Sequence, residues 1–595
     1  MPLIKTHERI VELLLAEGVD TIFGIPDPSF FAMFLEAEKR GIQCIAPHHE
    51  QGGALMADGY YRMTGKPAVM GINKGPGVAN IAAGAAYLAK ENVPAVFIMA
   101  QRQRFYEARV RRGKMQHMPQ PPLFAGAMKW IGAIEYPEQI DEVFHEAFRQ
   151  ALSGVPGPTM VEMPLSIMAA ALDLPPAPPP HRYRLVGQEA GTGALAEAVK
   201  LLTEAEQPLL LLGQGAFASR VQGDLVALAK KLACPVISST AVDAVLEGLD
   251  EVSLPYGSDA AAAAIESADV VLAIGTEIGE AMHYGRGRHW AKGKASRKWL
   301  YVERDPLAIG VNRPIDVPLV GDLKAVVPQI VTALGDLQRT PPAGLAGWAK
   351  SHAAAKAALT ASIPASDPIH PGRLSIEATK VLPKDTVIVR DGGASAMWFN
   401  ALLQLTPRDA MWNSNYGAIG PGLPMAVGAQ IAVGKDRRVA LLTGDSSVMF
   451  HIAELETAVR KNLPLLVVAA VDHAWGIEVA SYKANFGEDT PTPEAKWNPA
   501  VRLDKTAESF GAHGEYVTKA ADIGPAVERA LASGKPALVH VEIDAKANQS
   551  FAGLPGFAEF RTWYGEDGDF LGVPGQDGRK PEDDAGAPMT QGSGY

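Results

Sequence analysis

The chain has 595 residues, 47% of them hydrophobic and 20% charged, and its formal net charge is −11. This length exceeds one ordinary hydrophobic core and predicts about three domains. The acidic balance argues against a nucleic-acid surface, and no apolar stretch reaches the length of a membrane span. Cys44 and Cys234 cannot form a disulfide framework, and the N-terminus lacks a signal-peptide pattern, so we expect a soluble, cytoplasmic protein of enzyme size.

The first part of the chain alternates short apolar runs (TIFGI, CIAP, PAVMGI, PAVFIMA) with helix-like segments of about a dozen residues. This alternation recurs twice and predicts parallel sheets covered by helices on both faces. We therefore predict an α/β fold with three doubly wound parallel-sheet domains. The predicted segments are an N-terminal domain (1–172), a proline-rich linker (173–185), a middle domain (186–340), an Ala- and Pro-rich connector (341–367), a third domain (368–555) and a partly flexible C-terminal extension (556–595).

Two aspartates each follow directly on an apolar run in the third domain. Asp445 ends RVALLTGD and Asp472 ends LPLLVVAAVD, with the helix-spaced HIAELETAVRKN between them. A strand–helix–strand unit is right-handed and parallel, so both strands finish at the edge where such sheets bind ligands. Two carboxylates there repel each other unless they share a cation, and Mg²⁺ suits oxygen ligands and phosphates. One such Asp is commonly a helix N-cap. The pair, with Gly444 before it and the amides of Ser446 and Ser447 behind it, favours a magnesium–diphosphate site.

The stretch GDSS…VDHAWG resembles the cofactor motif of thiamine-diphosphate-dependent enzymes, a GDG followed after a fixed interval by NN. It is similar to the acetolactate synthase, benzaldehyde lyase and pyruvate decarboxylase type. The resemblance implies metal ligands at Asp445, Asp472 and the carbonyl of Ala474. The chain departs from the motif at Ser446, which replaces a glycine, and at Val471 and Asp472, which replace two asparagines. The extra charge should strengthen the dependence on the metal and weaken diphosphate affinity.

A second resemblance lies after the CIAP run, where HHEQGGALMADGYYRMTG is similar to the family's HEQ-GA-x-MA-DGYAR-x-TG. It makes Glu50 the acid that protonates the cofactor's aminopyrimidine, so that its imino nitrogen can take the C2 proton. Taken alone, Glu50 equally suits a helix N-terminus. KGPGVAN resembles the family's SGPG-x-x-N loop and implies close backbone approach at Gly75 and Gly77. Gln116 in KMQHM occupies the place of a glutamine that hydrogen-bonds the reacting carbonyl.

YGAIGPGLPMAVGAQ resembles the family's G-x-MGFGLPAAIGA turn, which implies that Ile419 is wedged beneath the bent cofactor and that the Gly417 carbonyl accepts from its 4′-amino group. RDGGASAMW is placed to contact the diphosphate. The cofactor-binding residues implied by all these matches are Glu50, Gly75, Gly393, Ala394, Ser395, Gly417, Ile419, Gly444, Asp445, Ser446, Ser447, Asp472, Ala474, Trp475, Gly476 and Ile477.

Members of the family differ in their substrates, and the pocket residues carry that difference. FGIPDPSFF puts Pro28 and Ser29 where relatives have His, Ser or Asp, and proline has no proton to donate. Proton transfer must then be carried out by other residues. A lone histidine, however, is more often a structural hydrogen-bonding residue than a catalytic one. Glu478 matches a glutamate that pyruvate decarboxylases use in a protonation step, with an exposed helix Glu as the alternative. The predicted catalytic residues are Glu50, Gln116, Glu478 and His49, and the predicted pocket residues are Pro28, Ser29, His117 and His473, with His48 a further acid–base candidate.

We expect C–C bond cleavage and formation on 2-oxo acids, with decarboxylation of pyruvate-like donors and carboligation to 2-hydroxy ketones. The alternatives are a diketone or acyloin hydrolase resembling cyclohexane-1,2-dione hydrolase, an acetolactate synthase-like acyl transferase, and a catalytically idle cofactor-binding subunit. Retention of Glu50, Gln116 and Ile419 argues against the last.

The middle domain resembles one that carries FAD in some members. The flavin signature is not evident between Glu277 and Lys298, so FAD is not predicted. Family members bind the cofactor between the first domain of one subunit and the third of another. This implies a homodimer as the minimum assembly and a homotetramer as a common one, with small oxo acid or ketone substrates as partners and neither nucleic acid nor membrane.

Overall fold

The computed structural model of the chain describes residues 3–554 apart from 108, 239–245, 294–295, 404–409 and 412–414. These residues form two compact units. The first comprises the chain up to Val186 together with Pro424–Gly434 and Glu456–Lys461, and the second comprises the remainder. The expected C-terminal extension, residues 556–595, lies outside the described residues.

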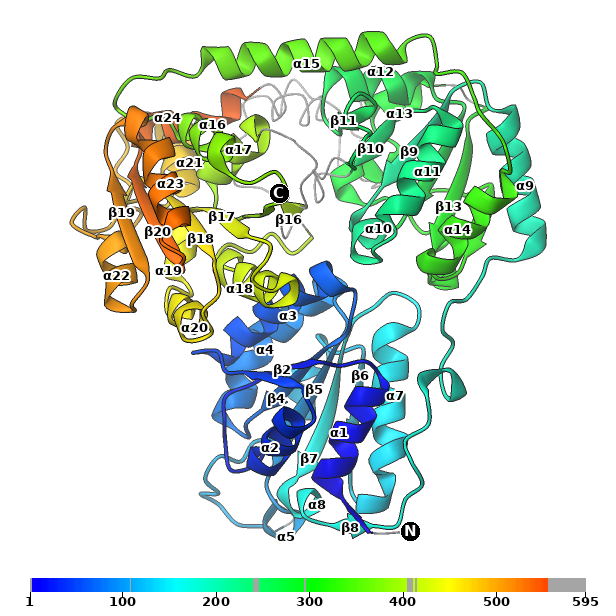
Figure 1. Cartoon of the computed structure of the whole chain (residues 1–595), viewed down its shortest axis with the longest axis vertical. Coiled ribbons are helices and arrows are strands. Elements are labelled where there is room, and N and C mark those ends of the chain that lie inside the picture. Colours follow the sequence, from blue (N-terminus) through cyan, green and yellow to red (C-terminus); the bar gives the residue numbers. More distant parts are fainter. Residues whose placement is uncertain are drawn as a thin grey trace. The chain divides into compact units, whose positions relative to one another are not determined.

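The first unit is built on a six-stranded sheet in which every pairing is parallel and the strand order is β3-β2-β4-β5-β7-β6. Helices flank this sheet (Figure 1). The strands are β2 (Thr21–Phe23), β3 (Gln43–Ile45), β4 (Ala68–Ile72), β5 (Ala95–Gln101), β6 (Trp130–Ala133) and β7 (Pro158–Pro164). The helices are α1 (Thr6–Ala16), α2 (Phe31–Lys39), α3 (Glu50–Thr64), α4 (Pro76–Lys90), α5 (Arg104–Glu107), α6 (Pro121–Phe124), α7 (Ile140–Leu152) and α8 (Leu165–Met168). A short antiparallel pair joins β1 (Ile4–Lys5) to β8 (Ala171–Leu172).

The last sheet of the described chain has the parallel order β16-β15-β17-β18-β20-β19. Its strands are β15 (Val387–Arg390), β16 (Ala410–Met411), β17 (Val439–Gly444), β18 (Leu466–Val471), β19 (His513–Val517) and β20 (Ala537–Glu542). The helices along this part of the chain are α16 (Pro371–Val381), α17 (Ala394–Leu402), α18 (Gly422–Val433), α19 (Asp445–Met449), α20 (Glu454–Arg460), α21 (Gly476–Phe486), α22 (Leu503–Ser509), α23 (Ile523–Ala532) and α24 (Ala545–Asn548), of which most of α18 and α20 belongs to the first unit. Numbered along the chain, both this sheet and the first have the order 2-1-3-4-6-5, so the two regions share one topology.

The middle sheet has a different order, β11-β10-β9-β12-β13-β14, which is 3-2-1-4-5-6 in chain order. Its strands are β9 (Pro208–Leu212), β10 (Val236–Ser238), β11 (Ser253–Pro255), β12 (Val270–Ile274), β13 (Lys298–Glu303) and β14 (Val317–Val320). Its helices are α9 (Thr192–Glu204), α10 (Gln214–Ala218), α11 (Gln222–Leu232), α12 (Asp259–Ser267), α13 (Arg288–Lys292) and α14 (Leu323–Ala333). The segment expected to be a connector contains the long helix α15 (Leu345–Ser362). The three sheets confirm the predicted α/β class.

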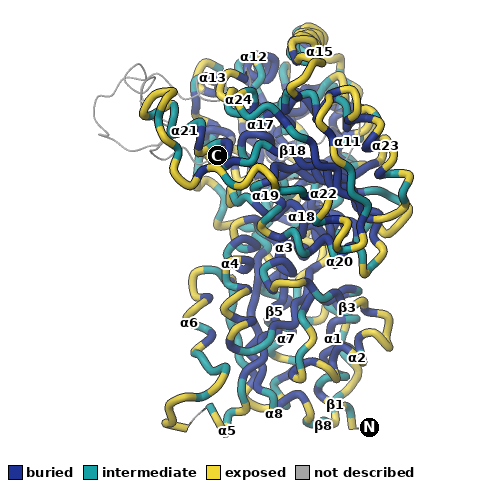
Figure 2. Tube along the Cα trace, turned by 90° about the vertical axis from the view of Figure 1, so that its left-hand side faces the viewer, coloured by how far each residue is buried: buried dark blue, intermediate teal, exposed yellow. Residues whose placement is uncertain are grey.

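The strands read as continuous apolar runs because both of their faces are buried. Alternate side chains of a strand point to opposite faces. In β9, Leu210 and Leu212 join one hydrophobic core, whereas Leu209 and Leu211 join another. Figure 2 shows β5 and β18 in dark blue, because every residue of these two strands is buried. A parallel sheet covered on both faces leaves its strand ends as the places where polar side chains can gather.

The predicted helix between the two aspartate-ended strands differs in detail. We expected one helix over HIAELETAVRKN, but the structure has α19 starting at Asp445 itself and α20 starting only at Glu454. Asp445 therefore lies in the first turn of a helix, with Gly444 as the N-cap.

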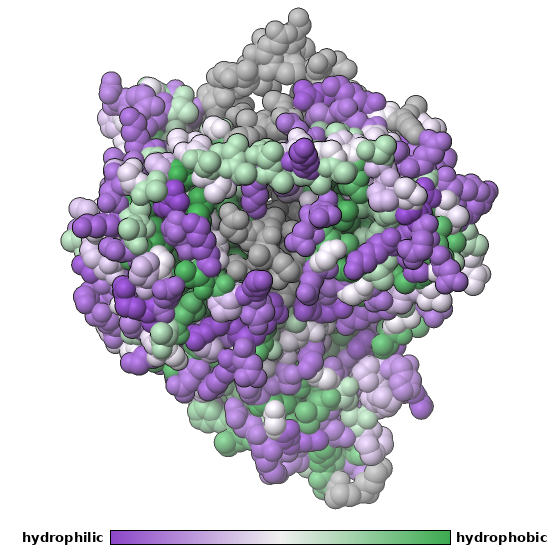
Figure 3. Space-filling view, turned by 45° about the horizontal axis from the view of Figure 1, so that its top comes forward, coloured by the Kyte–Doolittle hydropathy of each residue, from purple (hydrophilic) through white to green (hydrophobic). Residues whose placement is uncertain are grey.

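Hydrophilic residues cover much of the face seen in Figure 3. None of the helices in the described part of the chain has the length and apolar character that crossing a bilayer requires.

Candidate active site

Asp445 and Asp472 lie at the ends of neighbouring parallel strands, as the sequence predicts. Strands β17 and β18 pair in register, with Gly444 opposite Ala470. Asp445 follows β17 and is 2% exposed, and Asp472 directly follows β18. The prediction that both aspartates reach the same edge of the sheet is confirmed.

Backbone amides hold the two carboxylates in place. Asp445 accepts hydrogen bonds from the Ser446 amide at Oδ1 and from the His473 amide at Oδ2, both at 2.8 Å. Asp472 accepts from the Ala474 amide at Oδ1 over 3.3 Å and from Asn548 Nδ2 at Oδ2 over 2.7 Å. Asp445 is thus oriented partly by the loop that follows β18, whereas Asp472 is oriented by its own loop and by Asn548 of α24.

The electrostatics of this pair favour a bound cation. Burial, and then the charge of Asp472, raise the pKa of Asp445 well above its ordinary value. Burial also raises the pKa of Asp472, against the hydrogen bond from Asn548. A buried carboxylate and a half-buried one that destabilise each other's ionised form make an oxygen-rich site that a divalent ion would neutralise.

Small residues bring three chain segments together around these carboxylates. A Cβ on Gly476 would lie 2.9 Å from Asp472 Oδ2, so the start of α21 packs directly on the carboxylate. A Cβ on Gly393 would lie 2.9 Å from Ile477 Cδ1, which joins the start of α17 to the start of α21. Ser395 donates from Oγ to Asn548 Oδ1 over 3.3 Å. The structure therefore gathers most of the residues predicted to bind the cofactor: Gly393, Ala394, Ser395, Gly444, Asp445, Ser446, Ser447, Asp472, Ala474, Trp475, Gly476 and Ile477.

The glycine-rich turn before α18 is held by a buried carboxylate that the sequence analysis did not single out. Asp391 is 1% exposed and accepts from the amides of Gly420 at 3.0 Å, Gly422 at 2.7 Å and Gly392 at 2.7 Å. Burial raises the pKa of Asp391 to about 6 in spite of these donors. The turn includes Gly417 and Ile419, so Asp391 fixes the segment on which the predicted wedge lies.

Glu50 lies in the first unit, at the start of α3, and is 8% exposed. Asn80 donates from Nδ2 to Glu50 Oε2 over 2.9 Å. A Cβ on Gly77 would come within 2.9 Å of Glu50 Oε1, so the glycine leaves room for the carboxylate beside α4. The Glu50 carboxylate is therefore hydrogen-bonded by α4 at Oε2, and its Oε1 packs against Gly77 of the same helix.

Gln116 lies against the loop before α4, the helix whose Gly77 and Asn80 contact Glu50. It has a left-handed backbone (φ 54°), and a Cβ on Gly75 would lie 2.9 Å from its Cα. Gly75 itself has φ 67° and is the N-cap of α4. Both the close approach and the positive φ require glycine at this position. The structure thus brings Gly75, Gly77, Glu50 and Gln116 together in the first unit.

The predicted pocket residues of the first unit have different surroundings. Pro28 is exposed, whereas Ser29 is 2% exposed and donates from Oγ to Asp27 Oδ1 over 2.5 Å. His49 is exposed and caps α3, because its Nδ1 accepts from the Gln51 amide over 3.2 Å. His117 is half-buried, and its Nδ1 is a buried atom with no hydrogen-bond partner among the described residues.

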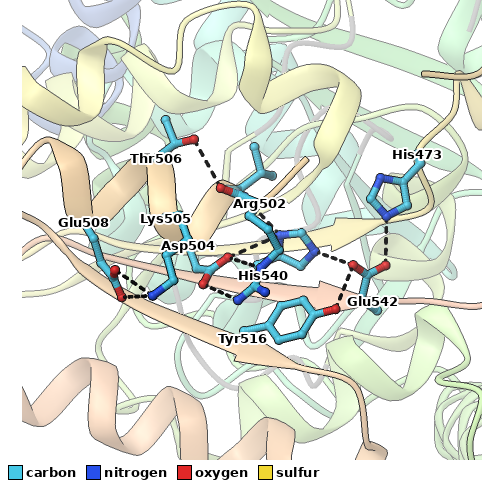
Figure 4. A network of polar contacts seen from close by, with 10 residues as sticks. His473, Arg502, Asp504, Lys505, Thr506, Glu508, Tyr516, His540 and Glu542 are labelled. Atoms are coloured by element: carbon cyan, nitrogen blue, oxygen red, sulfur yellow. Dashed lines mark hydrogen bonds and ion pairs between the residues drawn. The ribbon is translucent and has the colours of Figure 1, made fainter. Parts of the chain in front are cut away.

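His473 anchors one end of a polar network at the carboxyl edge of the last sheet (Figure 4). Its Nε2 lies 3.0 Å from Glu542 Oε2, and its backbone is left-handed (φ 55°). The Leu503 amide donates to Nδ1 of His540 over 3.2 Å, so the proton of that ring is on Nε2, which donates to Glu542 Oε1 over 2.9 Å. The ligand atoms of both histidines and Glu542 lie within 4.8 Å of one another. Hydrogen bonds account for these contacts, and the network holds the His473 amide toward Asp445.

Glu478, the other residue predicted to take part in proton transfer, is exposed in the first turn of α21. It follows Ile477, which packs on Gly393, so it lies one residue beyond the loop that is predicted to bind the cofactor. The structure therefore places Glu478 next to the predicted site and leaves its role as a prediction.

Three polar partners of the site were missed. Asn80 is the asparagine of the quoted SGPG-x-x-N loop, and its spacing from Gly77 was the available signal. Asp391 follows an apolar strand just as Asp445 and Asp472 do, and the same rule applied a third time would have found it. Asn548 belongs to the short helix α24, and nothing in its local sequence marks it.

Three models of one protein family match the chain in order along the three sheets. The thiamine pyrophosphate enzyme N-terminal TPP binding domain matches residues 4–128, the central domain matches 195–330, and the C-terminal TPP binding domain matches 391–541. The chain belongs to the thiamine-diphosphate-dependent enzymes. Thiamine pyrophosphate is the same cofactor under its older name, so the predicted family is confirmed.

Relatives of this enzyme are similar over nearly its whole length. The acetolactate synthase isozyme 2 large subunit of Escherichia coli (strain K12) is 28% identical over 91% of this chain and 95% of its own. The probable acetolactate synthase large subunit of Methanococcus aeolicus is 26% identical over 90% of this chain and 92% of its own. The sulfoacetaldehyde acetyltransferase of Alcaligenes xylosoxydans xylosoxydans is 27% identical over 88% and 90%.

Proposed function

We propose that this enzyme cleaves and forms carbon–carbon bonds of 2-oxo acids: it decarboxylates a pyruvate-like donor and joins the remaining fragment to an acceptor. The observation that carries the proposal is the Glu50 carboxylate, which is buried at the start of α3 and fixed by Asn80. An idle subunit would have no need of a buried acid in this position. Acetolactate synthase-like acyl transfer to an oxo acid is the second candidate, favoured by the names of the relatives.

The chemistry of the buried donor set fits Mg²⁺. Asp445 and Asp472 supply carboxylate oxygens and Ala474 supplies a backbone carbonyl, and hard oxygen ligands are those that Mg²⁺ prefers. The raised pKa of Asp445, caused by burial and by Asp472, supports the need for a cation there. The diphosphate would lie against the starts of α17, α19 and α21, where backbone amides point outward.

When bound, thiamine diphosphate supplies the carbon nucleophile that attacks carbonyl groups. In this proposal Glu50 holds a proton for the aminopyrimidine, because its Oε2 is already engaged by Asn80 and its Oε1 faces the space left by Gly77. Ile419 and the Gly417 carbonyl would help to hold the aminopyrimidine of the bound cofactor. Asp391 keeps that turn rigid through the amides of the glycines after Ile419.

The substrate carbonyl is proposed to bind near Gln116, whose amide can donate to the oxygen. Glu478 and His473 are proposed to serve the third-domain side of the pocket, and Pro28, Ser29, His49 and His117 the first-domain side. Because Pro28 cannot donate a proton, the acid that protonates the product must come from another of these residues. FAD is not part of the proposal.

We also propose a homodimer as the minimum assembly, a homotetramer as the full one, and a cytoplasmic location. The dimer is proposed because two subunits contribute to each site in the resembling family, in which a tetramer is common, and the location is proposed because the chain has only two cysteines.

Incubation of the purified protein with thiamine diphosphate, Mg²⁺ and pyruvate tests the proposed reaction. We expect release of CO2 with formation of acetoin or acetolactate, and the ratio of these two products distinguishes the first candidate from the second. A parallel assay with cyclohexane-1,2-dione tests the diketone hydrolase alternative. Absence of turnover of every oxo acid and diketone, with the cofactor demonstrably bound, would refute the proposal.

A further inference from the structure

Lys74 places an ammonium group inside the first-unit part of the proposed site. The residue stands in the quoted KGPG, at the place where the resembling family loop has serine, and directly precedes Gly75, the N-cap of α4. Its side chain is 15% exposed. A partly buried cation just before a helix N-terminus is unfavourable with respect to the helix dipole. Solvation alone therefore does not explain why a lysine stands just before the N-terminus of α4.

The contacts of Lys74 within the protein are loose. Its Nζ donates to Ser29 Oγ over 3.4 Å, and it lies 3.8 Å from Asp27 Oδ1. That carboxylate oxygen already accepts from the Ser29 hydroxyl over 2.5 Å and from the Ser29 amide over 2.8 Å. An ammonium has three N–H donors, so these two long contacts leave most of its capacity for a ligand. Ser29 and Asp27 hold the side chain in place without neutralising it closely.

The neighbours of Lys74 are residues proposed to surround the substrate. Gly75, the next residue, lies against the backbone of Gln116. Gly77 lies against Glu50 Oε1. On the other side, Asn73 Oδ1 is a buried atom with no hydrogen-bond partner among the described residues. The segment 73–77 therefore places a cation, Lys74, and the acceptor Asn73 Oδ1, unpaired among the described residues, in the same loop as the glycines that contact Gln116 and Glu50.

We infer that Lys74 is a specificity residue that binds an anionic group of the substrate, and that this group remains in the product. The inference rests on the proposed function. An ammonium stabilises a carboxylate more than the neutral CO2 that leaves, so it would slow decarboxylation if it bound the scissile carboxylate. Lys74 would therefore assist the reaction only by binding a carboxylate or sulfonate that remains in the product. The substrate class that fits is a small acceptor bearing a negative charge, such as a second 2-oxo acid, with Lys74 favouring it over an uncharged aldehyde.

Competition between two acceptors tests the inference. The holoenzyme is given pyruvate as the donor, and either pyruvate or acetaldehyde can act as the acceptor, giving acetolactate or acetoin. We expect Lys74→Met to lower the ratio of acetolactate to acetoin by at least about tenfold, the effect of losing one charged contact, and Lys74→Arg to lower it less. Lys66→Met is the matched control, because Lys66 is in the same unit but is an exposed residue paired with Asp20. An unchanged ratio in Lys74→Met would overturn the inference.

A binding measurement separates failure of this inference from failure of the proposed function. If the wild-type enzyme turns over no oxo acid, calorimetric titration of the Glu50→Gln holoprotein with pyruvate and with acetoin still measures whether Lys74 binds an anion. Saturable binding of pyruvate that Lys74→Met abolishes, with Lys66→Met unaffected, would support Lys74 as the anion site. Pyruvate binding that is absent, or equal with and without Lys74, would overturn it.

Discussion

Replacing Asp472 by asparagine should stabilise the metal-free protein, although it removes a buried hydrogen-bonding charge. Two unit charges about 5 Å apart repel by roughly 3 kcal/mol at an effective dielectric constant of about 20. Asparagine removes this repulsion from Asp445 and keeps one oxygen for the 2.7 Å hydrogen bond from Asn548. It loses the longer bond from the Ala474 amide, 3.3 Å in this structure, which is worth about 1 kcal/mol.

The expected net gain is therefore about 2 kcal/mol, an upper value because protonation of one carboxylate already relieves part of the repulsion. Thermal unfolding in the presence of EDTA measures the metal-free stability, and a second scan with saturating Mg²⁺ and thiamine diphosphate measures the ligand's contribution. The variant should unfold at a higher temperature than the wild type without metal. It should gain less from the ligands, because a neutral residue binds the cation less tightly.

Asp504→Asn is the control, because it makes the same chemical change with the opposite expected sign. Asp504 is buried and accepts two hydrogen bonds from Arg502 at 2.8 and 2.7 Å. Burial alone would raise the pKa of Asp504, but Arg502 holds it below its ordinary value, so the charge is stabilised where it is. Its removal should lower the unfolding temperature. If metal-free Asp472→Asn were also less stable than the wild type, repulsion between Asp445 and Asp472 would not be the dominant effect.

Three further variants test separate contacts. Gly77→Ala should displace the Glu50 carboxylate, 2.9 Å from the added Cβ, and slow cofactor C2 proton exchange by about tenfold or more with the fold intact by circular dichroism. Asp391→Asn should remove a pH dependence. With a folded pKa of about 6 against about 3.9 unfolded, the wild type loses about 2 kcal/mol of stability as pH rises from 4 to 6, whereas the variant does not. A stability difference independent of pH would contradict this. Glu542→Ala should release His473 and weaken Mg²⁺ binding about tenfold at fixed thiamine diphosphate, measured by titration, and unchanged affinity would count against the network's positioning role.

The sequence predicted the sheet architecture well because each strand carries its own signal. Strands buried on both faces are short apolar runs bounded by polar or glycine residues, and β9 and β18 are examples. The parallel connection rule then placed Asp445 and Asp472 at one edge without any knowledge of their distance. The start of α19 at Asp445 was missed, because a five-residue helix has too few residues to show a periodic pattern.

The partners of the site residues were harder to predict because they come from distant segments. Asn548 lies 76 positions from Asp472 and reaches it only because α24 follows the last strand of the sheet. Ser29, Asp27 and Lys74 illustrate the same limit, since Lys74 is 45 positions from Ser29. Each residue is ordinary in its local sequence, and only the folded backbone brings the three together. The different strand order of the middle sheet could not be predicted from the sequence either, since the apolar runs of all three sheets look alike.

Glu50 is proposed to activate thiamine diphosphate in this enzyme. The most direct test is the rate of hydrogen–deuterium exchange at C2 of the bound cofactor, followed by NMR after acid quench, in the wild type and in Glu50→Gln. Glutamine keeps a hydrogen-bonding group beside Asn80 but cannot transfer the proton. We predict that the variant binds the cofactor with little change and exchanges at least about 10²-fold more slowly. Exchange at the wild-type rate in the fully loaded variant would contradict the account.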